Sequence, residues 1–159
     1  MVEGLITTNF GNIKIKLFPD VTPETVRHFM TLAKSIFYAV ILFHRVLPAC
    51  MIQCGDSKTK KAVKNTWGIG DPGYNIKDKF KSRSHIRGIV SMARSSDPDS
   101  AGSQFFIVTS DSTFLDKEYT VFGEVIEGMD AADKIVNLPR DSNDCPLQEA
   151  KMLQLTISE

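Results

Sequence analysis

Short apolar segments bounded by turn-forming residues run through most of this 159-residue chain, and this pattern restricts the folds that it can adopt. The segments with the length, alternation or β-branched composition of strands are residues 5–7, 13–17, 42–45, 51–54, 86–93, 104–109, 120–125 and 152–157. Many short strands with few helices are typical of a closed barrel or a sandwich. The pattern therefore predicts a mainly β fold and leaves barrel and sandwich open.

Two further segments carry helical signals. Thr22 suits the N-cap position, and Pro23 suits the first position of a helix. Apolar residues then recur at helical spacing, at Val26, Phe29, Met30 and Ala33. We expect this face to lie in the core, and we expect a second helix over residues 129–136.

Composition favours one domain over residues 1–159, because no repeat, low-complexity tract or linker interrupts the chain. The 19 basic residues balance the 19 acidic ones, so no overall charge favours nucleic acid or a membrane surface. We expect a monomer that binds neither. Residues 58–94 differ locally, with ten Lys or Arg against Asp71 and Asp78. Such a stretch is either a basic face for an acidic partner or a solvated loop surface.

Cys50, Cys54 and Cys145 are an odd number of cysteines without the spacing of a disulfide framework. On an extended strand Cys50 and Cys54 would lie about 13 Å apart, too far for a disulfide. Their spacing also matches no standard zinc site. The first residues lack the basic start and apolar core of a secretory signal. These features predict free thiols, no metal and a cytoplasmic location.

One arginine and two glutamines lie inside segments that otherwise have the composition of apolar strands. Arg45 follows Phe-His in residues 43–48, Gln53 follows Met-Ile, and Gln104 precedes Phe-Phe-Ile. Burying a guanidinium is costly without partners, and a carboxylate across a sheet is the ordinary partner of a lone arginine. An amide can instead hold the guanidinium without cancelling its charge. An oriented cation on an apolar surface could polarise a bound amide.

Several motifs in the same order resemble the cyclophilins, the cyclosporin-binding class of peptidyl-prolyl cis-trans isomerases. They are Phe-His-Arg-Val at 43–46, Met-Ile-Gln at 51–53, Ser-Met-Ala-Arg at 91–94, Gly-Ser-Gln-Phe-Phe-Ile at 102–107 and Val-Phe-Gly-Glu-Val at 121–125. The resemblance covers nearly the whole chain. It implies a closed eight-stranded antiparallel β-barrel capped by two α-helices, with a packed interior and the substrate groove on the outside.

The resemblance also implies roles for individual residues. Arg45 would be the catalytic donor, and Gln53 would hold it in place. The substrate-binding residues would be Cys50, Met51, Ala93, Arg94, Gln104, Phe106, Phe114, Leu115 and Tyr119. His44, which precedes Arg45, is expected to be structural because isomerisation needs no proton transfer.

The implied reaction is rotation about an X–Pro amide bond, which resonance opposes with a barrier of about 20 kcal/mol. No covalent bond breaks, so no nucleophile, metal or cofactor is required. Twisting the bond localises the lone pair on the proline nitrogen. A donor aimed at that nitrogen stabilises the twisted state more than the planar one, which lowers the barrier.

The chain departs from the family pattern at several pocket positions. Cys50 stands where most relatives have phenylalanine, Tyr119 where histidine is common, and Phe114 where many eukaryotic relatives have tryptophan. Because phenylalanine lacks the indole donor, we expect weak cyclosporin binding. Cys54 replaces a usual glycine. Oxidation of Cys50 could alter the pocket, although inert buried thiols are the simpler interpretation.

Two functional classes fit these residues. The first is an active isomerase acting on proline-containing peptides and on unfolded or folding proteins. The second is a degenerate binding module for proline-containing segments that turns them over slowly. A hydrolase is not indicated, because no nucleophile–base pair is recognisable around the serines and cysteines.

Overall fold

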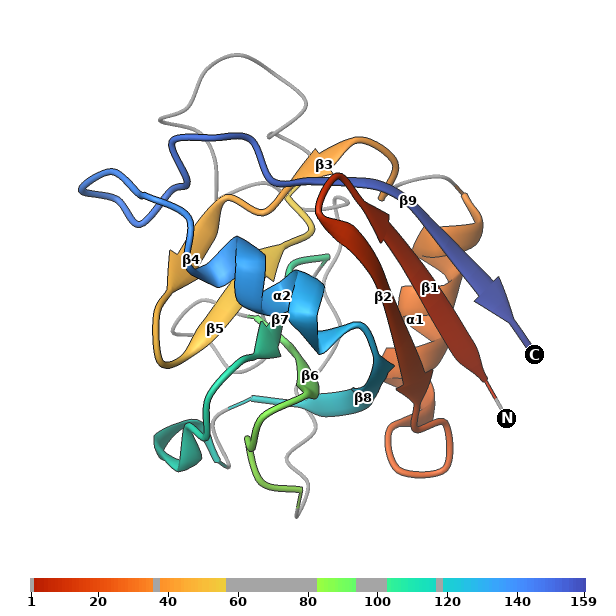
Figure 1. The fold of residues 1–159 in the computed structure, drawn as a ribbon. Helices are drawn as coiled ribbons and strands as arrows, with labels where there is room; N and C mark the ends of the chain where they lie inside the picture. Colours follow the sequence, from red (N-terminus) through yellow and green to blue (C-terminus); the bar gives the residue numbers. More distant parts are fainter. Residues whose placement is uncertain (1, 36–37, 57–82, 94–102, 117–118) are drawn as a thin grey trace.

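The computed structural model describes residues 2–35, 38–56, 83–93, 103–116 and 119–159. Within these ranges nine antiparallel strands form one curled sheet in the order β3-β9-β1-β2-β8-β6-β7-β5-β4 (Figure 1). The strands are β1 (Glu3–Thr8), β2 (Gly11–Leu17), β3 (Ile41–Leu42), β4 (Arg45–Leu47), β5 (Met51–Cys54), β6 (Ile89–Met92), β7 (Phe105–Val108), β8 (Val121–Glu127) and β9 (Lys151–Ser158). The helices are α1 (Pro23–Lys34) and α2 (Met129–Val136), and η3 (Thr113–Leu115) is a short 3-10 helix. The expected mainly β, antiparallel fold with two helices is confirmed.

In the described part of the chain the sheet has nine strands where eight were expected, because the predicted strand at residues 42–45 is divided between two partners. β3 pairs with β9 through Ile41 and Met152, whereas β4 pairs with β5 through Arg45 and Gln53. Only two residues separate β3 from β4, and these strands are the two ends of the sheet order. The two edge strands of the curled sheet are therefore neighbours in the sequence.

The helices begin where the sequence predicts. Thr22 is the N-cap of α1 and Pro23 is its first residue, but the Thr22 side chain makes no capping bond. Its hydroxyl donates instead to Phe18 O at 3.4 Å. The predicted apolar face of α1 is buried except at Met30, which is partly exposed. Phe29 from this face packs against Phe105 and Phe122, with ring centroids 5.3 and 4.9 Å away.

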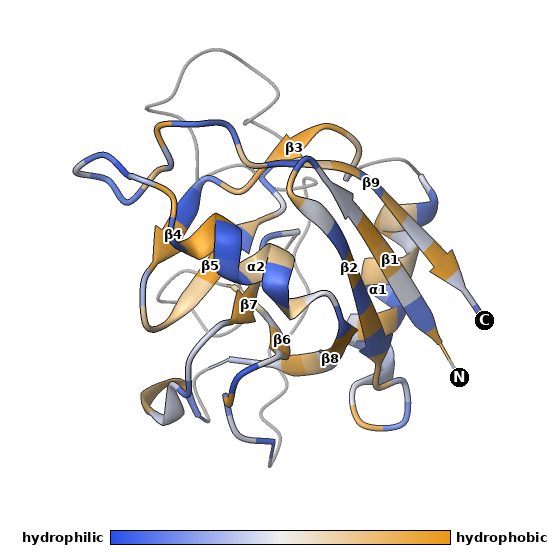
Figure 2. Cartoon of the chain, in the orientation of Figure 1, coloured by the Kyte–Doolittle hydropathy of each residue, from blue (hydrophilic) through white to orange (hydrophobic). Residues whose placement is uncertain are grey.

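Hydrophobic and hydrophilic residues alternate along β1, β2 and β9, as Figure 2 shows. In β2 the buried side chains are Ile13, Ile15 and Leu17, which belong to the main core together with residues of α1 and α2. Alternation places successive side chains on opposite faces of a strand. One face of this part of the sheet therefore packs on the core while the other faces solvent.

β7 differs because both of its faces are buried. Phe105 and Ile107 belong to the main core, whereas Phe106 and Val108 belong to a second, smaller apolar cluster. The period of two along a strand assigns these pairs to opposite faces of the sheet. The second cluster therefore covers the outer face of the sheet at β7. None of the helices in the described part of the chain is long and apolar enough to cross a membrane.

Candidate functional site

A cavity of about 420 Å³ opens beside the second apolar cluster. It is lined by Arg45, Leu47, Pro48, Cys50, Met51, Gln53, Ala93, Phe106, Phe114, Leu115 and Tyr119. Its residues come from β4, β5, β7, η3 and the segments that follow β4, β6 and η3. Residues distant in sequence are therefore brought together on the outer face of the sheet.

Nine of the eleven site residues predicted from the sequence line this cavity. Gln104 does not line it but is hydrogen-bonded to Gln53, which does. Arg94 and most of the basic stretch at 58–94 lie outside the described residues. Leu47 and Pro48 line the cavity and were missed, although they belong to the same motif as Arg45. Leu47 pairs with Met51 across the β4–β5 hairpin, and this register follows from the short turn.

Arg45 and Gln53 form the polar wall of the cavity. The two residues are opposite each other in the β4–β5 pair, and Arg45 Nη1 donates to Gln53 Oε1 at 3.4 Å. Arg45 lies on the edge strand β4, is exposed, and lines the cavity. Within the described ranges no carboxylate forms an ion pair with it. Its charge is therefore not cancelled by a described neighbour.

The Gln53 amide is oriented by a second amide behind it. Gln53 is 9% exposed, and its Nε2 donates to Gln104 Oε1 at 2.9 Å. This bond uses the amino end of Gln53 and leaves the carbonyl end for Arg45. The backbone beside Gln104 is held by Gly55, whose O accepts from Ser103 Oγ at 2.7 Å. Gly55 has φ +99°, and a Cβ there would lie 2.4 Å from Ser103 O, so only glycine fits.

The apolar wall consists of Met51, Phe106, Leu115 and Tyr119. Phe106 is 3% exposed and meets Tyr119 edge to face, with centroids 5.5 Å apart and planes at 88°. This is a favourable aromatic geometry. Phe114, at the rim, is 72% exposed. The wall can accept a small apolar ring, while the polar wall presents a donor beside it.

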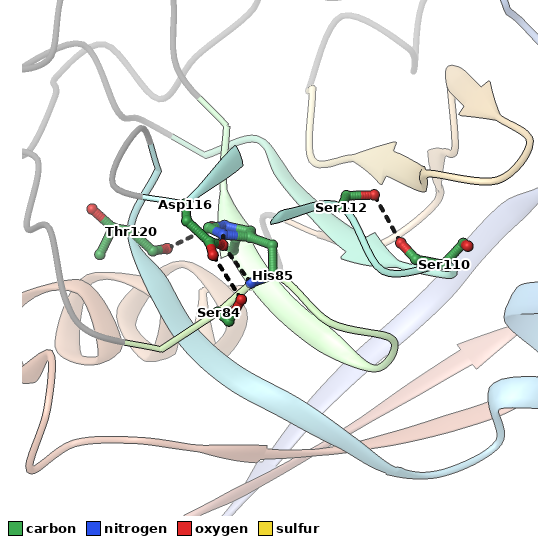
Figure 3. A network of polar contacts seen from close by, with 7 residues as sticks. Ser84, His85, Ser110, Ser112, Asp116 and Thr120 are labelled. Atoms are coloured by element: carbon green, nitrogen blue, oxygen red, sulfur yellow. Dashed lines mark hydrogen bonds and ion pairs between the residues drawn. The ribbon is translucent and has the colours of Figure 1, made fainter. Parts of the chain in front are cut away.

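A hydrogen-bonded network lies beneath the apolar wall, and sequence reasoning missed it. Figure 3 shows Asp116 between Ser84 and His85. His85 Nδ1 is 3.0 Å from Asp116 Oδ1, and its Nε2 is 3.1 Å from Ser91 Oγ. The Ser84 hydroxyl lowers the pKa of Asp116 below its usual value, the His85 backbone and ring act in the same direction, and partial burial opposes them. No spacing in the sequence marks these residues, because Asp116 is far along the chain.

The order Ser91, His85, Asp116 is that of a nucleophile, a base and an orienting carboxylate. No such pair is recognisable in the sequence, because the contact between Ser91 and His85 arises only in the fold. Ser91 is nevertheless fully buried, does not line the cavity, and donates its hydroxyl to Thr120 O at 2.9 Å. A serine held in this way cannot reach a substrate, so the network has a structural character.

His44, which precedes Arg45 in the sequence, is buried. Burial lowers its pKa to about 4, with the Asp56 carboxylate opposing this shift and the Arg45 charge adding to it. Its Nδ1 has no hydrogen-bond partner among the described residues. At neutral pH the ring is therefore uncharged, and it does not line the cavity.

All three cysteines are free thiols. Cys50 is half-buried and lines the cavity, whereas Cys54 lies in the main core. Burial raises the pKa of the Cys54 thiol, which keeps it protonated and unreactive. Of the two thiols, only Cys50 thus borders the site. Among the described residues no cluster of His, Cys, Asp or Glu could hold a metal ion.

Comparison with known proteins identifies the family. Residues 4–157 match the family described as cyclophilin type peptidyl-prolyl cis-trans isomerase/CLD. A peptidyl-prolyl cis-trans isomerase of Acinetobacter baylyi is 40% identical, over 99% of this chain and 85% of its own length. Peptidyl-prolyl cis-trans isomerase-like 3 of Dictyostelium discoideum is 38% identical, over 94% of this chain and 91% of its own. A crystal structure of a Cryptosporidium parvum cyclophilin type isomerase, solved in the presence of the dipeptide Ala-Pro, superposes with a TM-score of 0.90 at 31% identity, covering 99% of each chain. The chain therefore belongs to the cyclophilin-type peptidyl-prolyl cis-trans isomerases.

Proposed function

We propose that this protein accelerates rotation about X–Pro bonds in peptides and folding proteins, with Arg45 as the catalytic donor. The proline ring enters the apolar wall formed by Met51, Phe106 and Leu115. As the bond twists, the proline nitrogen becomes a better acceptor, and an Arg45 N–H donates to it. Interactions that strengthen only in the twisted state lower the barrier, whereas equal binding of both states does not.

One observation carries this proposal: an exposed guanidinium lines the same cavity as the buried Phe106 ring, and neutral amides hold it. Gln53 and Gln104 form a line of hydrogen bonds that ends on Arg45 Nη1. Because these partners carry no charge, the full positive charge of Arg45 is available to a bound amide. A rate increase of about 10⁵-fold would require about 7 kcal/mol of such selective stabilisation.

The decisive variant is Arg45→Ala. We expect the catalysed exchange rate of an Ala-Pro peptide, measured by NMR exchange spectroscopy, to fall about 100-fold or more, as for loss of one preorganised donor. Peptide binding should persist, since the apolar wall is intact. Arg27→Ala, on the exposed face of α1, is the matched control and should retain full activity. Turnover of Arg45→Ala within twofold of the native rate would refute the proposed role.

A binding module with slow turnover is the second candidate, because two residues that line the cavity depart from the family pattern. Cys50 is half-buried in this wall where the family resemblance implies a phenylalanine ring, and Tyr119 stands in place of histidine. Loss of a ring there removes apolar contact with proline. In the same NMR experiment a pure binder would shift the peptide peaks without raising the interconversion rate.

Folding chains are the proposed natural substrates, because a cavity of this size contacts proline and few neighbouring residues. Refolding of a protein whose slow phase is limited by proline isomerisation provides the test. The native protein should accelerate that phase, whereas Arg45→Ala should leave it unchanged. Acceleration by both proteins would point to a chaperone effect that is independent of Arg45.

A further inference from the structure

The last strand, β9, has an open edge along its C-terminal half. One edge of β9 pairs with β1 over residues 152–158, whereas β3 pairs with the other edge only at Lys151 and Met152. β9 continues beyond β3 toward the C-terminus, as Figure 1 shows. In the described part of the chain no strand pairs with this second edge after Met152. An open edge presents backbone donors and acceptors that another extended chain can use.

The register of the β1–β9 pair shows which backbone groups face the open edge. Asn9 N donates to Lys151 O at 3.2 Å, and residues that bond a neighbouring strand recur at every second position of an antiparallel ladder. The bulge of this pair adds its extra residue to β9, so β1 keeps that alternation. Leu5 is therefore a bonding residue of β1, and its partner is Thr156. The residues on either side of Thr156 direct their N–H and C=O groups to the open edge.

These residues, Leu155 and Ile157, offer two donors and two acceptors to a further strand. Among the described residues no backbone group bonds them on the open side. Leu155 belongs to the main core and Ile157 packs against it, so both side chains lie on the core side of the sheet. In a chain paired with this edge, the side chains opposite them would lie on the same side.

A cavity of about 420 Å³ lies beside this edge. It is lined by Ala33, Lys34, Tyr38, Ala39 and residues 153–157. We call this cavity, with the outward backbone groups of β9, the edge groove. It shares no lining residue with the cavity that contains Arg45. The edge groove can therefore receive apolar side chains separately from that cavity.

The backbone conformation of Val40 explains why the edge is open. Val40 precedes β3 with φ +59°, a left-handed conformation that is rare for a β-branched residue. If β3 were longer, the register of Ile41 with Met152 would bring Val40 opposite Leu153 and cover the edge. The left-handed conformation is incompatible with a strand, so the pairing stops at Ile41. Strained backbone of this kind is concentrated at functional sites.

We propose that the edge groove binds an extended, uncharged segment of another protein, which adds a strand to β9. In such binding, main-chain hydrogen bonds supply affinity and pockets select alternate side chains. The segment has apolar side chains at the two positions opposite Leu155 and Ile157. Proline is excluded at both, because each must donate an N–H.

The charges beside the edge groove favour an uncharged segment. Lys34 Nζ lies 3.0 Å from Glu159 Oε1, and Lys151 Nζ lies 3.0 Å from Glu149 Oε2. Both lysines are therefore paired with a carboxylate of this chain. A charged segment would gain little from them and would lose hydration on entering the groove.

A second copy of this chain fits the edge less well. Stable interfaces bury about 800 Å² on each partner. Two copies joined through β9 would bond each other only through Leu155 and Ile157, which is a small part of such an interface. An edge this short suits a flexible segment that can also fill the cavity beside it.

Hydrogen exchange followed by NMR tests the proposal with a peptide that contains no proline. On addition of capped Thr-Val-Thr-Val-Thr, whose valines have the required alternation, amide exchange of Leu155 and Ile157 should slow about fivefold or more. The same peptide with N-methylvaline at both positions lacks the N–H donors and should leave the exchange unchanged. Equal slowing by both peptides, or none by the first at millimolar concentration, would overturn the proposal.

Variants locate the bound peptide. Ala39→Glu places a charged side chain in the edge groove and should weaken binding about tenfold. Leu147→Glu adds the same charge at a 65% exposed position outside the groove and should bind normally. Arg45→Ala should also bind as the native protein does. Native affinity of Ala39→Glu, or loss of binding in Arg45→Ala, would contradict this location.

Exchange without peptide tests the second copy as the occupant. The rates of Leu155 and Ile157 should not depend on protein concentration. Slowing at high concentration would show that two copies pair through β9 and would overturn the proposed occupant. None of these results depends on the isomerase activity, because the peptide contains no X–Pro bond.

Discussion

The two walls of the cavity are held in place by different means. On the polar wall Arg45 is exposed and is tied to Gln53 by one 3.4 Å hydrogen bond. On the apolar wall Phe106 is 3% exposed and packs against Tyr119 and the His85 ring. The polar wall therefore holds its cation by a hydrogen bond to a neutral amide, while the apolar wall is part of a packed layer.

Each wall also adjoins one buried histidine, and the two histidines differ in their partners. His44, next to Arg45, has an unpartnered Nδ1 among the described residues and a pKa lowered by burial. His85 has partners at both ring nitrogens. Burial without a partner at Nδ1 therefore keeps the His44 imidazole uncharged at neutral pH.

The largest expected effect is on the free energy of unfolding, and it should differ between the two walls. Phe106→Ala should lower the free energy of unfolding by about 3–5 kcal/mol, because it empties a buried, well-packed site. Arg45→Ala should change it by less than about 0.5 kcal/mol, because the side chain is exposed. Urea unfolding followed by circular dichroism gives both values. Equal losses in the two variants would break the comparison.

The next effect concerns pH. The unfolded protein takes up a proton on His44 near pH 6.5, whereas the folded protein does so only at about 4. Stability should therefore fall as the pH drops from 6.5 to 4, by about 3 kcal/mol from this residue. Over the same pH range, the free energy of unfolding of His44→Gln, measured by urea titration, should fall by that much less. Identical pH profiles of the native protein and the variant would contradict the assigned environment.

A smaller effect concerns the neutrality of the polar wall. Gln53→Glu puts a carboxylate beside Arg45 and should lower the catalysed exchange rate about tenfold, since an ion pair reduces the field that a bound amide experiences. Gln154→Glu, at an exposed position of β9, adds the same charge outside the cavity and serves as the control. Full activity of Gln53→Glu would mean that the Arg45 charge need not be free.

The smallest effect concerns the rim. Phe114→Trp should strengthen cyclosporin binding about fivefold in calorimetry, the value of about one hydrogen bond from the new indole N–H. Stability should not change measurably, because this position is 72% exposed. Leu147→Trp, at another exposed position, controls for added aromatic surface. Nanomolar binding by the unmodified protein would contradict the expected weakness.

Much of the fold could be predicted because its signals are local. The α2 helix has the bounds expected from the sequence, and the hairpin of β1 and β2 follows its alternation. The strand at residues 42–45 was predicted less well. Its division into β3 and β4 reflects a change of partner, because β3 pairs with β9, more than a hundred positions away, whereas β4 pairs with the nearby β5.

The sequence by itself determined the family, the apolar periodicity and nine of the residues that line the cavity, because these depend on residue types in order along the chain. Tertiary structure alone decided that Arg45 is exposed, that Gln104 is hydrogen-bonded to Gln53, and that His85 meets Asp116 and Ser91 beneath Phe106. The physical reason is that burial and hydrogen-bond partners are set by strand register and loop packing. A histidine thirty-one positions from its carboxylate carries no local signal of that contact.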